Sequence, residues 1–175
     1  MNKDEINTIL VTGGGGYLGS ILTRLLIKKG YNVIVLDNFL YNNKYSLEGI
    51  SDRHRLRIIE GNLLDYEILR SIMKKTDAVI HLAAIVGDPA CNVDALRAVK
   101  TNYVGTVLLA KLALEHNIKK FIFTSTCSVY GYSTHWIDEQ SPTNPLGLYG
   151  ETKLRAEEAL KILFTKTNIR QPVLI

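Results

Sequence analysis

The feature that most constrains the fold is a regular alternation of short β-rich runs with longer segments of helical periodicity. The short runs consist mainly of Val, Ile, Leu and Phe, as expected for strands that are buried on both faces of a sheet. Strands that are joined through helices run parallel, with right-handed crossovers and with helices on both faces. The expected strands are residues 8–12, 32–37, 56–60, 77–82, 120–125 and 172–175.

The segments between these runs predict amphipathic helices, each with apolar residues on one face. The expected helices are residues 17–29, 66–74, 93–116 and 148–166. Asp65 is the expected N-cap of the second helix, and Gly30 is the expected stop of the first. The first helix carries an apolar stripe through Leu18, Ile21, Leu22, Leu25 and Leu26, and the third through Leu96, Val99, Val104, Leu108 and Leu112.

These elements predict a doubly wound parallel α/β sheet of the Rossmann type that occupies residues 1–175 as one domain. Residues 38–53 are expected to form a loop with one helical turn. Residues 132–147, which are rich in Pro, Ser, Thr and Asn, are expected to form a surface loop. A parallel strand is normally followed by more structure. We therefore expect the chain to be a fragment that is truncated in its sixth strand.

Composition and charge argue against several classes of protein. The 21 Lys and Arg residues are scattered and the net charge is only +4, which argues against a nucleic-acid partner. The two cysteines, Cys91 and Cys127, lack the spacing of a metal site and indicate a reduced protein without a bound metal. We expect no signal peptide, and no apolar run approaches the roughly 18 residues of a membrane span. The expected protein is cytoplasmic and has no membrane partner.

Three glycines lie directly between the first expected strand and the first expected helix. Gly13 suits a tight turn out of the strand, Gly16 lets a pyrophosphate approach the backbone, and Gly19 lets helix and sheet pack closely. The helix N-terminus would add free N–H groups and the positive end of its dipole. The glycine pattern alone also suits a flexible turn. Its place between a strand and a helix favours a dinucleotide site.

Asp37 favours NAD over NADP as the dinucleotide. It ends the second expected strand, where a carboxylate accepts hydrogen bonds from the adenosine ribose hydroxyls. The same charge repels a 2′-phosphate, and no arginine follows Asp37 immediately. The alternative is a strand-end aspartate without a ligand, which the preceding glycine turn makes the weaker interpretation.

A second constellation lies near the end of the chain. Tyr149 and Lys153 are one helical turn apart, so they share one face of the last expected helix. A tyrosine is a poor base at its ordinary pKa of about 10, but a neighbouring ammonium and a positive nicotinamide favour the phenolate. As an isolated pair, the two residues also suit a solvated helix face. Hydroxyl-bearing residues in the segment 124–131 follow the fifth strand, at the edge where α/β sheets bind ligands.

Taken in order, seven motifs resemble the extended short-chain dehydrogenase/reductase family, which comprises NAD-dependent nucleotide-sugar epimerases and dehydratases. The motifs are TGGGGYLG, VLDN, GNLLD, HLAA, TNYVGT, FTSTCSVYG and DEQSPTNPLGLYGETK, and the resemblance covers residues 8–175. It implies that Thr126 hydrogen-bonds the substrate and that Tyr149 is the general acid/base. It also implies that Lys153 holds the nicotinamide ribose and lowers the pKa of the tyrosine.

The glycine turn and the resemblance together imply a set of cofactor-binding residues. Asn62 and Leu63 would lie at the adenine, Ala83 and Ala84 beside the pyrophosphate and ribose, and Asn102 would be the buried helix asparagine that is common in the family. The full set is Gly13, Gly16, Tyr17, Leu18, Gly19, Asp37, Asn38, Asn62, Leu63, Ala83, Ala84, Asn102, Tyr149 and Lys153.

Three positions depart from the family pattern. Asn62 replaces the usual aspartate at the adenine, although its carbonyl is still able to accept a hydrogen bond. Cys127 and Ser128 stand where the sugar 4,6-dehydratases carry Asp-Glu, the acid and base that eliminate water. Nucleotide-sugar decarboxylases carry a glutamate at the position of Ser128. These departures favour an epimerase.

The resemblance therefore implies epimerisation of a nucleotide sugar through a transient keto form, with hydride passing to bound NAD and back. The alternatives are a reductase or dehydratase of the same family, or a truncated NAD-binding module without catalysis. In the family a substrate domain follows the sixth strand, and we expect this chain to lack most of it. Sugar specificity is expected to lie mainly in that domain. The family pairing implies a homodimer through helices 93–116 and 148–166.

Overall fold

The computed structural model describes residues 5–165 and 173–174 of the 175-residue chain. Its strands form one parallel sheet in the order β3-β2-β1-β4-β5-β6. This confirms the predicted parallel α/β fold. The strands are β1 (Thr8–Thr12), β2 (Asn32–Asp37), β3 (Leu56–Glu60), β4 (Ala78–His81), β5 (Lys120–Phe123) and β6 (Val173–Leu174). Of the expected strand 172–175, Pro172 and Ile175 lie outside the described residues, as does Lys166 of the last expected helix.

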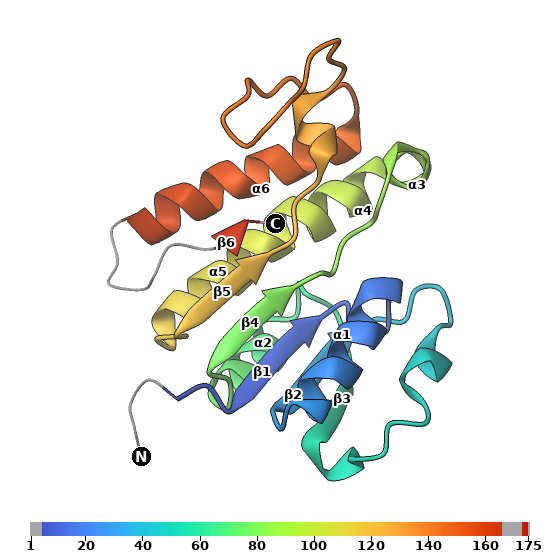
Figure 1. Cartoon of the computed structure of the whole chain (residues 1–175), viewed down its shortest axis with the longest axis vertical. Helices are drawn as coiled ribbons and strands as arrows, with labels where there is room; N and C mark the ends of the chain where they lie inside the picture. Colours follow the sequence, from blue (N-terminus) through green and yellow to red (C-terminus); the bar gives the residue numbers. More distant parts are fainter. Residues whose placement is uncertain (1–4, 166–172, 175) are drawn as a thin grey trace.

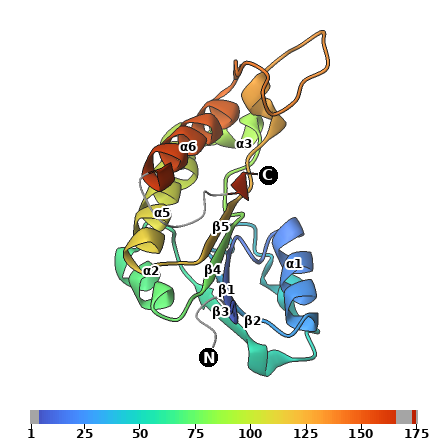
Figure 2. The same ribbon diagram turned by 60° about the vertical axis from the view of Figure 1, so that its left-hand side comes forward.

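Helices cover both faces of the sheet, as predicted (Figures 1 and 2). Figure 2 shows α1 (Tyr17–Lys28) against one face, and α2 (Tyr66–Met73), α5 (Thr106–Glu115) and α6 (Leu148–Thr165) against the other. A large apolar cluster, which includes Leu109, Phe121, Phe123 and Leu160, fills the space under α2, α5 and α6. A smaller cluster, built on the β1 and β2 side chains, lies under α1. Each fully buried Leu or Phe contributes about 1.5–3 kcal/mol, so these clusters hold the layers together.

The strand register brings the carboxyl ends of four strands to one edge of the sheet. Thr12 pairs with Leu36 and with His81, and His81 pairs with Phe123. The segments that follow β1, β2, β4 and β5 therefore leave the sheet side by side (Figure 1). The strand order reverses between β1 and β4, and open α/β sheets bind ligands at such a point.

Local signals place the ends of two helices correctly. Asp65 caps α2 by accepting a hydrogen bond from the backbone N–H of Ile68 at 3.0 Å. Gly30 follows the end of α1 with a φ of +93°, a conformation that glycine adopts without strain. The expected turn in residues 38–53 is present as η1 (Lys44–Leu47), and a further short turn, η2 (Arg53–Arg55), precedes β3.

Only part of the apolar stripe of α1 packs toward the sheet, where Leu26 contacts the smaller cluster. Leu18, Ile21 and Leu25 are about half exposed. The buried residues of α1 are instead Gly19, Ser20, Thr23 and Ile27. A Cβ atom on Gly19 would lie 2.2 Å from the carbonyl oxygen of Gly13, so only a face of small residues allows this close approach.

The long helix expected over residues 93–116 is present from Ala95 to Glu115, but it starts two residues later and is not α-helical throughout. It consists of α4 (Ala95–Val99), the π-helical η3 (Lys100–Gly105) and α5 in direct succession. Asp94 separates α4 from the preceding short helix α3 (Asp88–Val93), and its carboxylate caps α4 at the backbone N–H of Arg97. Leu96 and Val104, both expected in the apolar stripe, are exposed, whereas Ala98 and Asn102 are buried. The buried Asn102 amide bonds across to Ile85, and the wider π turn accommodates that position.

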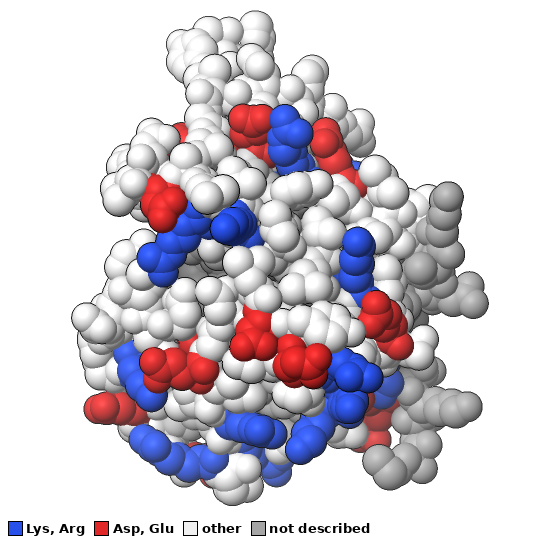
Figure 3. Space-filling view, turned by 180° about the vertical axis from the view of Figure 1, so that it is seen from behind, with Lys and Arg blue, Asp and Glu red and all other residues white. Residues whose placement is uncertain are grey.

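The surface carries charges of both signs without segregation on the face that Figure 3 shows. The segment 132–147 forms the predicted surface loop between η4 (Cys127–Tyr130) and α6, and most of its residues are exposed (Figure 1). Within residues 5–165 and 173–174, no helix has both the length and the apolar character needed to cross a membrane.

Candidate functional site

The glycine turn after β1 is held tightly against β2 and β4. The Gly13 N–H donates to the carbonyl of Leu36 at 2.9 Å, and Gly13 has a φ of +72°. A Cβ on Gly13 would lie 2.7 Å from the backbone nitrogen of Ala83. The glycine at position 13 is therefore needed for both its conformation and its lack of a side chain.

The N-terminus of α1 opens onto the space beside this turn. The helix begins directly after Gly16, and Gly16 provides no side chain to cap it. The first N–H groups of any helix lack intrahelical partners and carry partial positive charge. No acidic residue occupies the first turn of α1. This end of the helix therefore offers unshielded donors to an anion.

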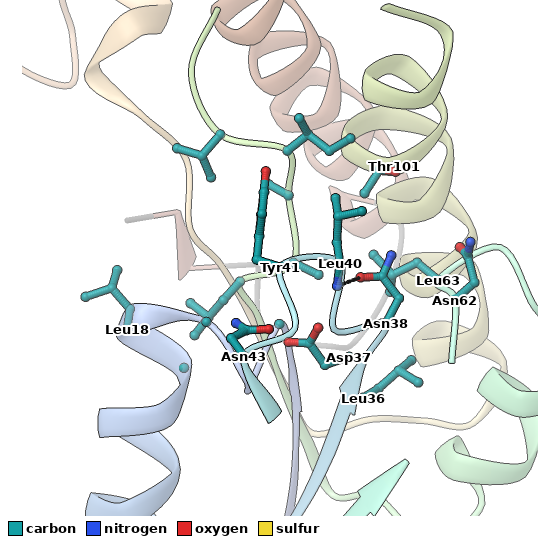
Figure 4. Close-up of a pocket in the computed structure, with 18 of the residues that line it drawn as sticks. Leu18, Leu36, Asp37, Asn38, Leu40, Tyr41, Asn43, Asn62, Leu63 and Thr101 are labelled. Atoms are coloured by element: carbon teal, nitrogen blue, oxygen red, sulfur yellow. Dashed lines mark hydrogen bonds between the residues drawn. The ribbon is translucent and has the colours of Figure 1, made fainter. Parts of the chain in front are cut away.

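A cavity of about 500 Å³ lies over the turn and the carboxyl edge of the sheet (Figure 4). In Figure 4, Leu18 lies on one side of the drawn residues, Asn62 and Thr101 lie on the other, and Asp37 and Asn38 lie between them. The cavity wall contains most of the residues that the sequence implied for the cofactor. These are Gly13, Gly16, Tyr17, Leu18, Gly19, Asp37, Asn38, Asn62, Leu63, Ala83 and Ala84.

Asp37 organises one side of this cavity. Its carboxylate accepts from the Gly15 N–H at 2.9 Å and from the Phe39 N–H at 2.8 Å. The carboxylate therefore links the glycine turn to the loop after β2. Carboxylate oxygens have further lone pairs, which are free to accept from ligand hydroxyls.

Asn43 is a cavity residue that the sequence reasoning missed. Its Nδ2 donates to the Gly15 carbonyl at 2.6 Å, and Ser46 Oγ donates to the same carbonyl at 2.7 Å. Its Oδ1 is buried and has no hydrogen-bond partner. A buried acceptor without a partner is unfavourable by about 1–3 kcal/mol, which a ligand donor removes. The signal that was available is the position of Asn43 within six residues of Asp37 in a polar loop.

The residues present fit NAD. The free N–H groups of α1 and the bare Gly16 suit a pyrophosphate, and Asp37 suits a ribose without a 2′-phosphate. The orphaned Oδ1 of Asn43 offers a further acceptor to the ligand. Leu40, Tyr41, Ile85, Val86, Arg97 and Thr101 also line the cavity and were not expected from the sequence. Of these, Arg97 and Thr101 come from helical segments whose boundaries the sequence misplaced.

Asn102 lies behind the cavity wall rather than in it. It is 1% exposed, and its side chain bonds to the N–H of Ile85 at 2.8 Å and to the carbonyl of Ile85 at 2.9 Å. Its Nδ2 also donates to Thr152 Oγ1 at 3.2 Å. Asn102 therefore fixes the backbone of a cavity residue and links it to α6.

The structure brings two of the three expected catalytic residues, Thr126 and Tyr149, close together and places Lys153 one helical turn beyond Tyr149. Thr126 follows β5 and caps η4, with its Oγ1 accepting from the Ser128 N–H at 3.2 Å. Tyr149, in the first turn of α6, lies close enough to Thr126 for that hydroxyl to lower the pKa of the phenol. The tyrosine packs in a small apolar cluster with Ile85, Cys91 and Ala98. Ile85 also lines the cavity, so Tyr149 lies next to the cavity wall.

Lys153 is buried one turn further along α6. It is 3% exposed, and its ammonium lies 3.9 Å from the centre of the Phe123 ring. Burial lowers its pKa to about 7, and the negative charge of Glu157 partly opposes this effect. Glu157 accepts a hydrogen bond from Ser125 and lies 3.7 Å from Lys161. Glu157 is therefore the negative charge that favours the protonated lysine.

The pKa of Tyr149 is raised in this structure, contrary to the expectation that Lys153 lowers it. Burial raises it most, the neighbouring Thr126 hydroxyl partly lowers it, and the thiols of Cys91 and Cys127 raise it further. Desolvation disfavours the phenolate, so the burial of Tyr149 dominates its pKa.

His81 is a structural residue beneath the site. Its ring bonds to Thr12 Oγ1 at 2.6 Å and to Thr106 Oγ1 at 2.8 Å. Burial, with a smaller effect of Lys153, lowers its pKa to about 3, so it is neutral near pH 7. In the part of the chain that the structure describes, no group of three or more His, Cys, Asp or Glu is placed to hold a metal.

Comparison with known proteins shows the family to which the chain belongs. The model of the NAD dependent epimerase/dehydratase family matches residues 9–174. A UDP-glucose 4-epimerase of Halalkalibacterium halodurans is 38% identical over 155 residues, which are 86% of this chain and 44% of that protein. The chain thus spans about half the length of the curated relatives it matches.

Two solved structures are similar over almost the whole chain. The UDP-glucose 4-epimerase of Thermotoga maritima with UDP-glucose has a TM-score of 0.87 and 29% identity, and the match covers 95% of this chain and 54% of that one. The UDP-glucose 4-epimerase of Brucella ovis in complex with NAD has a TM-score of 0.86 and 31% identity, and the match covers 96% of this chain and 50% of that one.

Proposed function

Because this chain belongs to the NAD dependent epimerase/dehydratase family, we propose that it carries the cofactor site and the acid/base centre of a nucleotide-sugar epimerase. The observation that carries the proposal is the position of Tyr149 beside Thr126 and next to the cavity over the glycine turn. A phenol and a hydroxyl at the carboxyl edge of the sheet suit proton transfer to a sugar hydroxyl. The similar structures support the substrate class, since they are epimerases of UDP-sugars.

NAD, when bound, would supply a positive nicotinamide ring, accept a hydride from a sugar carbon and return it to the opposite face. Tyr149 would take the proton of the sugar hydroxyl at its Oη and give it back. Thr126 would orient that hydroxyl through its Oγ1. Lys153, while protonated, would favour the phenolate electrostatically, and Glu157 would support its charge. The apolar cluster around Tyr149 would exclude water from the proton transfer.

The cofactor would lie along the cavity wall. The pyrophosphate would meet the N-terminus of α1 at Gly16, and the adenosine ribose would meet Asp37. Asn62, Leu63, Ala83 and Ala84 would line the adenine and ribose positions. Asn102 would act from behind the wall through Ile85.

The groups beside Thr126 favour epimerisation over dehydration. Elimination of water requires an acid and a base in addition to the tyrosine. Cys127 is exposed, and the Oγ of Ser128 accepts a hydrogen bond from the Oγ1 of Thr126, with 3.1 Å between the two oxygens. Neither side chain is a carboxyl group, so the nearby residues lack the expected elimination pair.

The test is the substitution Tyr149→Phe, with Tyr130→Phe in η4 as the matched control. Both variants should bind NAD with wild-type affinity in calorimetric titration. Tyr149→Phe should abolish interconversion of UDP-sugar epimers, since loss of the general acid/base removes about 10²–10⁴-fold of rate. Tyr130→Phe should remain active.

Three outcomes have distinct meanings. Near-normal turnover by Tyr149→Phe would refute the assignment of the acid/base. Wild-type protein that binds NAD but converts no UDP-sugar would favour an NAD-binding module without catalysis. Failure to bind NAD would refute the cofactor site itself.

A homodimer is proposed for the outer faces of α4, η3, α5 and α6. Exposed apolar residues on α3, α4, η3 and α6 support it, because exposed apolar surface often marks an interface. They are Val93, Leu96, Val104 and Ile162. Light scattering should give a mass of two chains, and a mass of one chain would contradict the proposal. We also propose the cytoplasm as the compartment, which the free thiols of Cys91 and Cys127 support.

A further inference from the structure

The helix that carries Tyr149 and Lys153 lacks a cap of its own. The residue before its first turn is Gly147, whose carbonyl accepts from the Glu151 N–H at 3.0 Å. Helix N-caps are normally Ser, Thr, Asp or Asn, whose side chain accepts from an N–H group of the first turn. Glycine supplies no such acceptor. The first-turn N–H groups of α6 therefore need a partner from elsewhere in the chain.

Asp88 provides that partner from a different part of the sequence. It begins α3, which follows β4, and its Oδ1 accepts from the backbone N–H of Tyr149 at 2.8 Å. The two residues are 61 positions apart. A carboxylate at a helix N-terminus also interacts favourably with the positive end of the helix dipole.

The space at Gly147 is occupied by this carboxylate. A Cβ on Gly147 would lie 2.2 Å from Asp88 Oδ2 and 2.3 Å from Asp88 Oδ1. Gly147 does not have a positive φ, so the position needs glycine for space and not for its backbone conformation. Any side chain that could cap α6 locally would displace Asp88.

A second contact holds the same turn from the other side. A Cβ on Gly150 would lie 2.6 Å from the carbonyl oxygen of Ser128, so α6 packs directly against the segment that presents Thr126. The first turn of α6 is thus fixed between the β4–α3 connection and η4. Tyr149 lies between these two attachments.

We propose that Asp88 is a positioning residue, which caps α6 from the β4–α3 connection and thereby sets Tyr149 against Thr126. This inference rests on the proposed function, since it assigns Asp88 a role in the proton transfer. Asp88 is not among the residues that line the cofactor cavity. It acts through the backbone of Tyr149 and not by contact with cofactor or substrate.

A local cap and a remote cap differ in what they hold. A serine at position 147 would stabilise α6 but would not attach it to the β4–α3 connection. With Asp88 replaced by alanine, the space at Gly147 is open to such a serine. The double variant D88A/G147S therefore separates helix stability from the position of Tyr149.

The experiment compares wild type, D88A, D88N and D88A/G147S. In D88A the Tyr149 amide should exchange with solvent at least about tenfold faster, because it loses a charge-assisted hydrogen bond. The ¹³Cζ signal of Tyr149, assigned with Tyr149→Phe, should shift as the contact with Thr126 changes. Epimerase kcat should fall about tenfold with unchanged KM, which corresponds to about 1.4 kcal/mol. NAD affinity should be unchanged.

In D88A/G147S the melting temperature should return to the wild-type value, while kcat and the Tyr149 ¹³Cζ signal should stay at their D88A values. D88N, which keeps an acceptor oxygen, should stay close to wild type in every readout. The proposal is overturned if G147S also restores kcat and the ¹³Cζ signal, because Asp88 would then only stabilise the helix. It is equally overturned if the Tyr149 amide exchanges at the wild-type rate in D88A.

Two contingencies leave the test decisive. If D88A does not fold, D88N and D88A/G147S supply the comparison. The proposal is then supported if the Tyr149 ¹³Cζ signal is shifted in D88A/G147S but stays at the wild-type position in D88N. If the wild type converts no UDP-sugar, the proposed function fails, but amide exchange and the ¹³Cζ signal still decide whether Asp88 positions Tyr149.

Discussion

Replacing the buried Lys153 by methionine should stabilise the protein, most strongly at low pH. The pKa of Lys153 is lowered from 10.5 to about 7, mainly because burial disfavours the ammonium. That difference corresponds to about 5 kcal/mol of free energy that folding loses when the lysine enters the structure protonated. Lys153→Met removes this loss and keeps a long apolar side chain at the same place. It also removes the contact with Phe123 and leaves Glu157 with Ser125 and Lys161.

The sign of the pH dependence follows from proton binding. Between pH 7 and 10.5 the unfolded lysine is protonated and the folded one is neutral, so the unfolded state binds more protons. Wild-type stability therefore rises with pH in this window, by about 1.4 kcal/mol per unit in its middle. The variant lacks this rise. Below pH 7 the lysine is protonated in both the folded and the unfolded wild type, so the full loss of about 5 kcal/mol of folding free energy applies.

The assay is urea denaturation of both proteins at several pH values from 6 to 10. After subtracting the lost contacts, we expect Lys153→Met to be more stable by about 2–3 kcal/mol at pH 6. The advantage should shrink steadily above pH 7 and reverse near pH 9, because about 1.4 kcal/mol per pH unit removes it within about two units. Lys111→Met, on the exposed face of α5, is the control and should keep the wild-type pH profile. A stability difference that does not change with pH, or a variant less stable at pH 6, would refute the reasoning.

Two further substitutions test the cofactor pocket. Gly19→Ala places a Cβ 2.2 Å from the Gly13 carbonyl, so α1 must move. It should lower the free energy of unfolding by about 1–3 kcal/mol and weaken NAD binding, whereas Leu25→Ala on the exposed face of α1 should do neither. Asp37→Asn removes the charge at the ribose position and should weaken NAD about tenfold or more while improving NADP, as measured by calorimetry with both cofactors. An equal loss for both cofactors would contradict the assigned role of Asp37.

The parts of the fold that follow from the sequence are those with local causes. The strands are recognisable because each is a short apolar run between turn residues. Asp65 and Gly30 act on backbone groups within a few residues of themselves, and the structure contains both devices. The glycine turn after β1 also has a local cause, since a strand, three spaced glycines and a helix are contiguous in sequence.

The parts that could not be predicted depend on contacts between distant residues. The face that α1 buries is set by its approach to the turn at Gly13, which overrides the apolar stripe. The π turn at η3 is associated with the bonds of Asn102 to Ile85, 17 residues away. The cap of α6 comes from Asp88, although the local sequence offers only Gly147. Periodicity and local propensity contain no information about such partners.

The two buried bases His81 and Lys153 change the stability of the protein in separate pH ranges, one below and one above neutral pH. His81, bonded to Thr12 and Thr106, has a pKa lowered from 6.5 to about 3. The unfolded histidine binds more protons in that window, so stability is lost as pH falls below about 6.5. Lys153 responds only between pH 7 and 10.5. Removing Lys153 also removes its small repulsion of the protonated His81, and this second effect alters the pH dependence of stability only below pH 6.5. A stability difference that changes with pH above 7 therefore reports on Lys153, and one that changes with pH only below 6.5 reports on the network of His81 with Thr12 and Thr106.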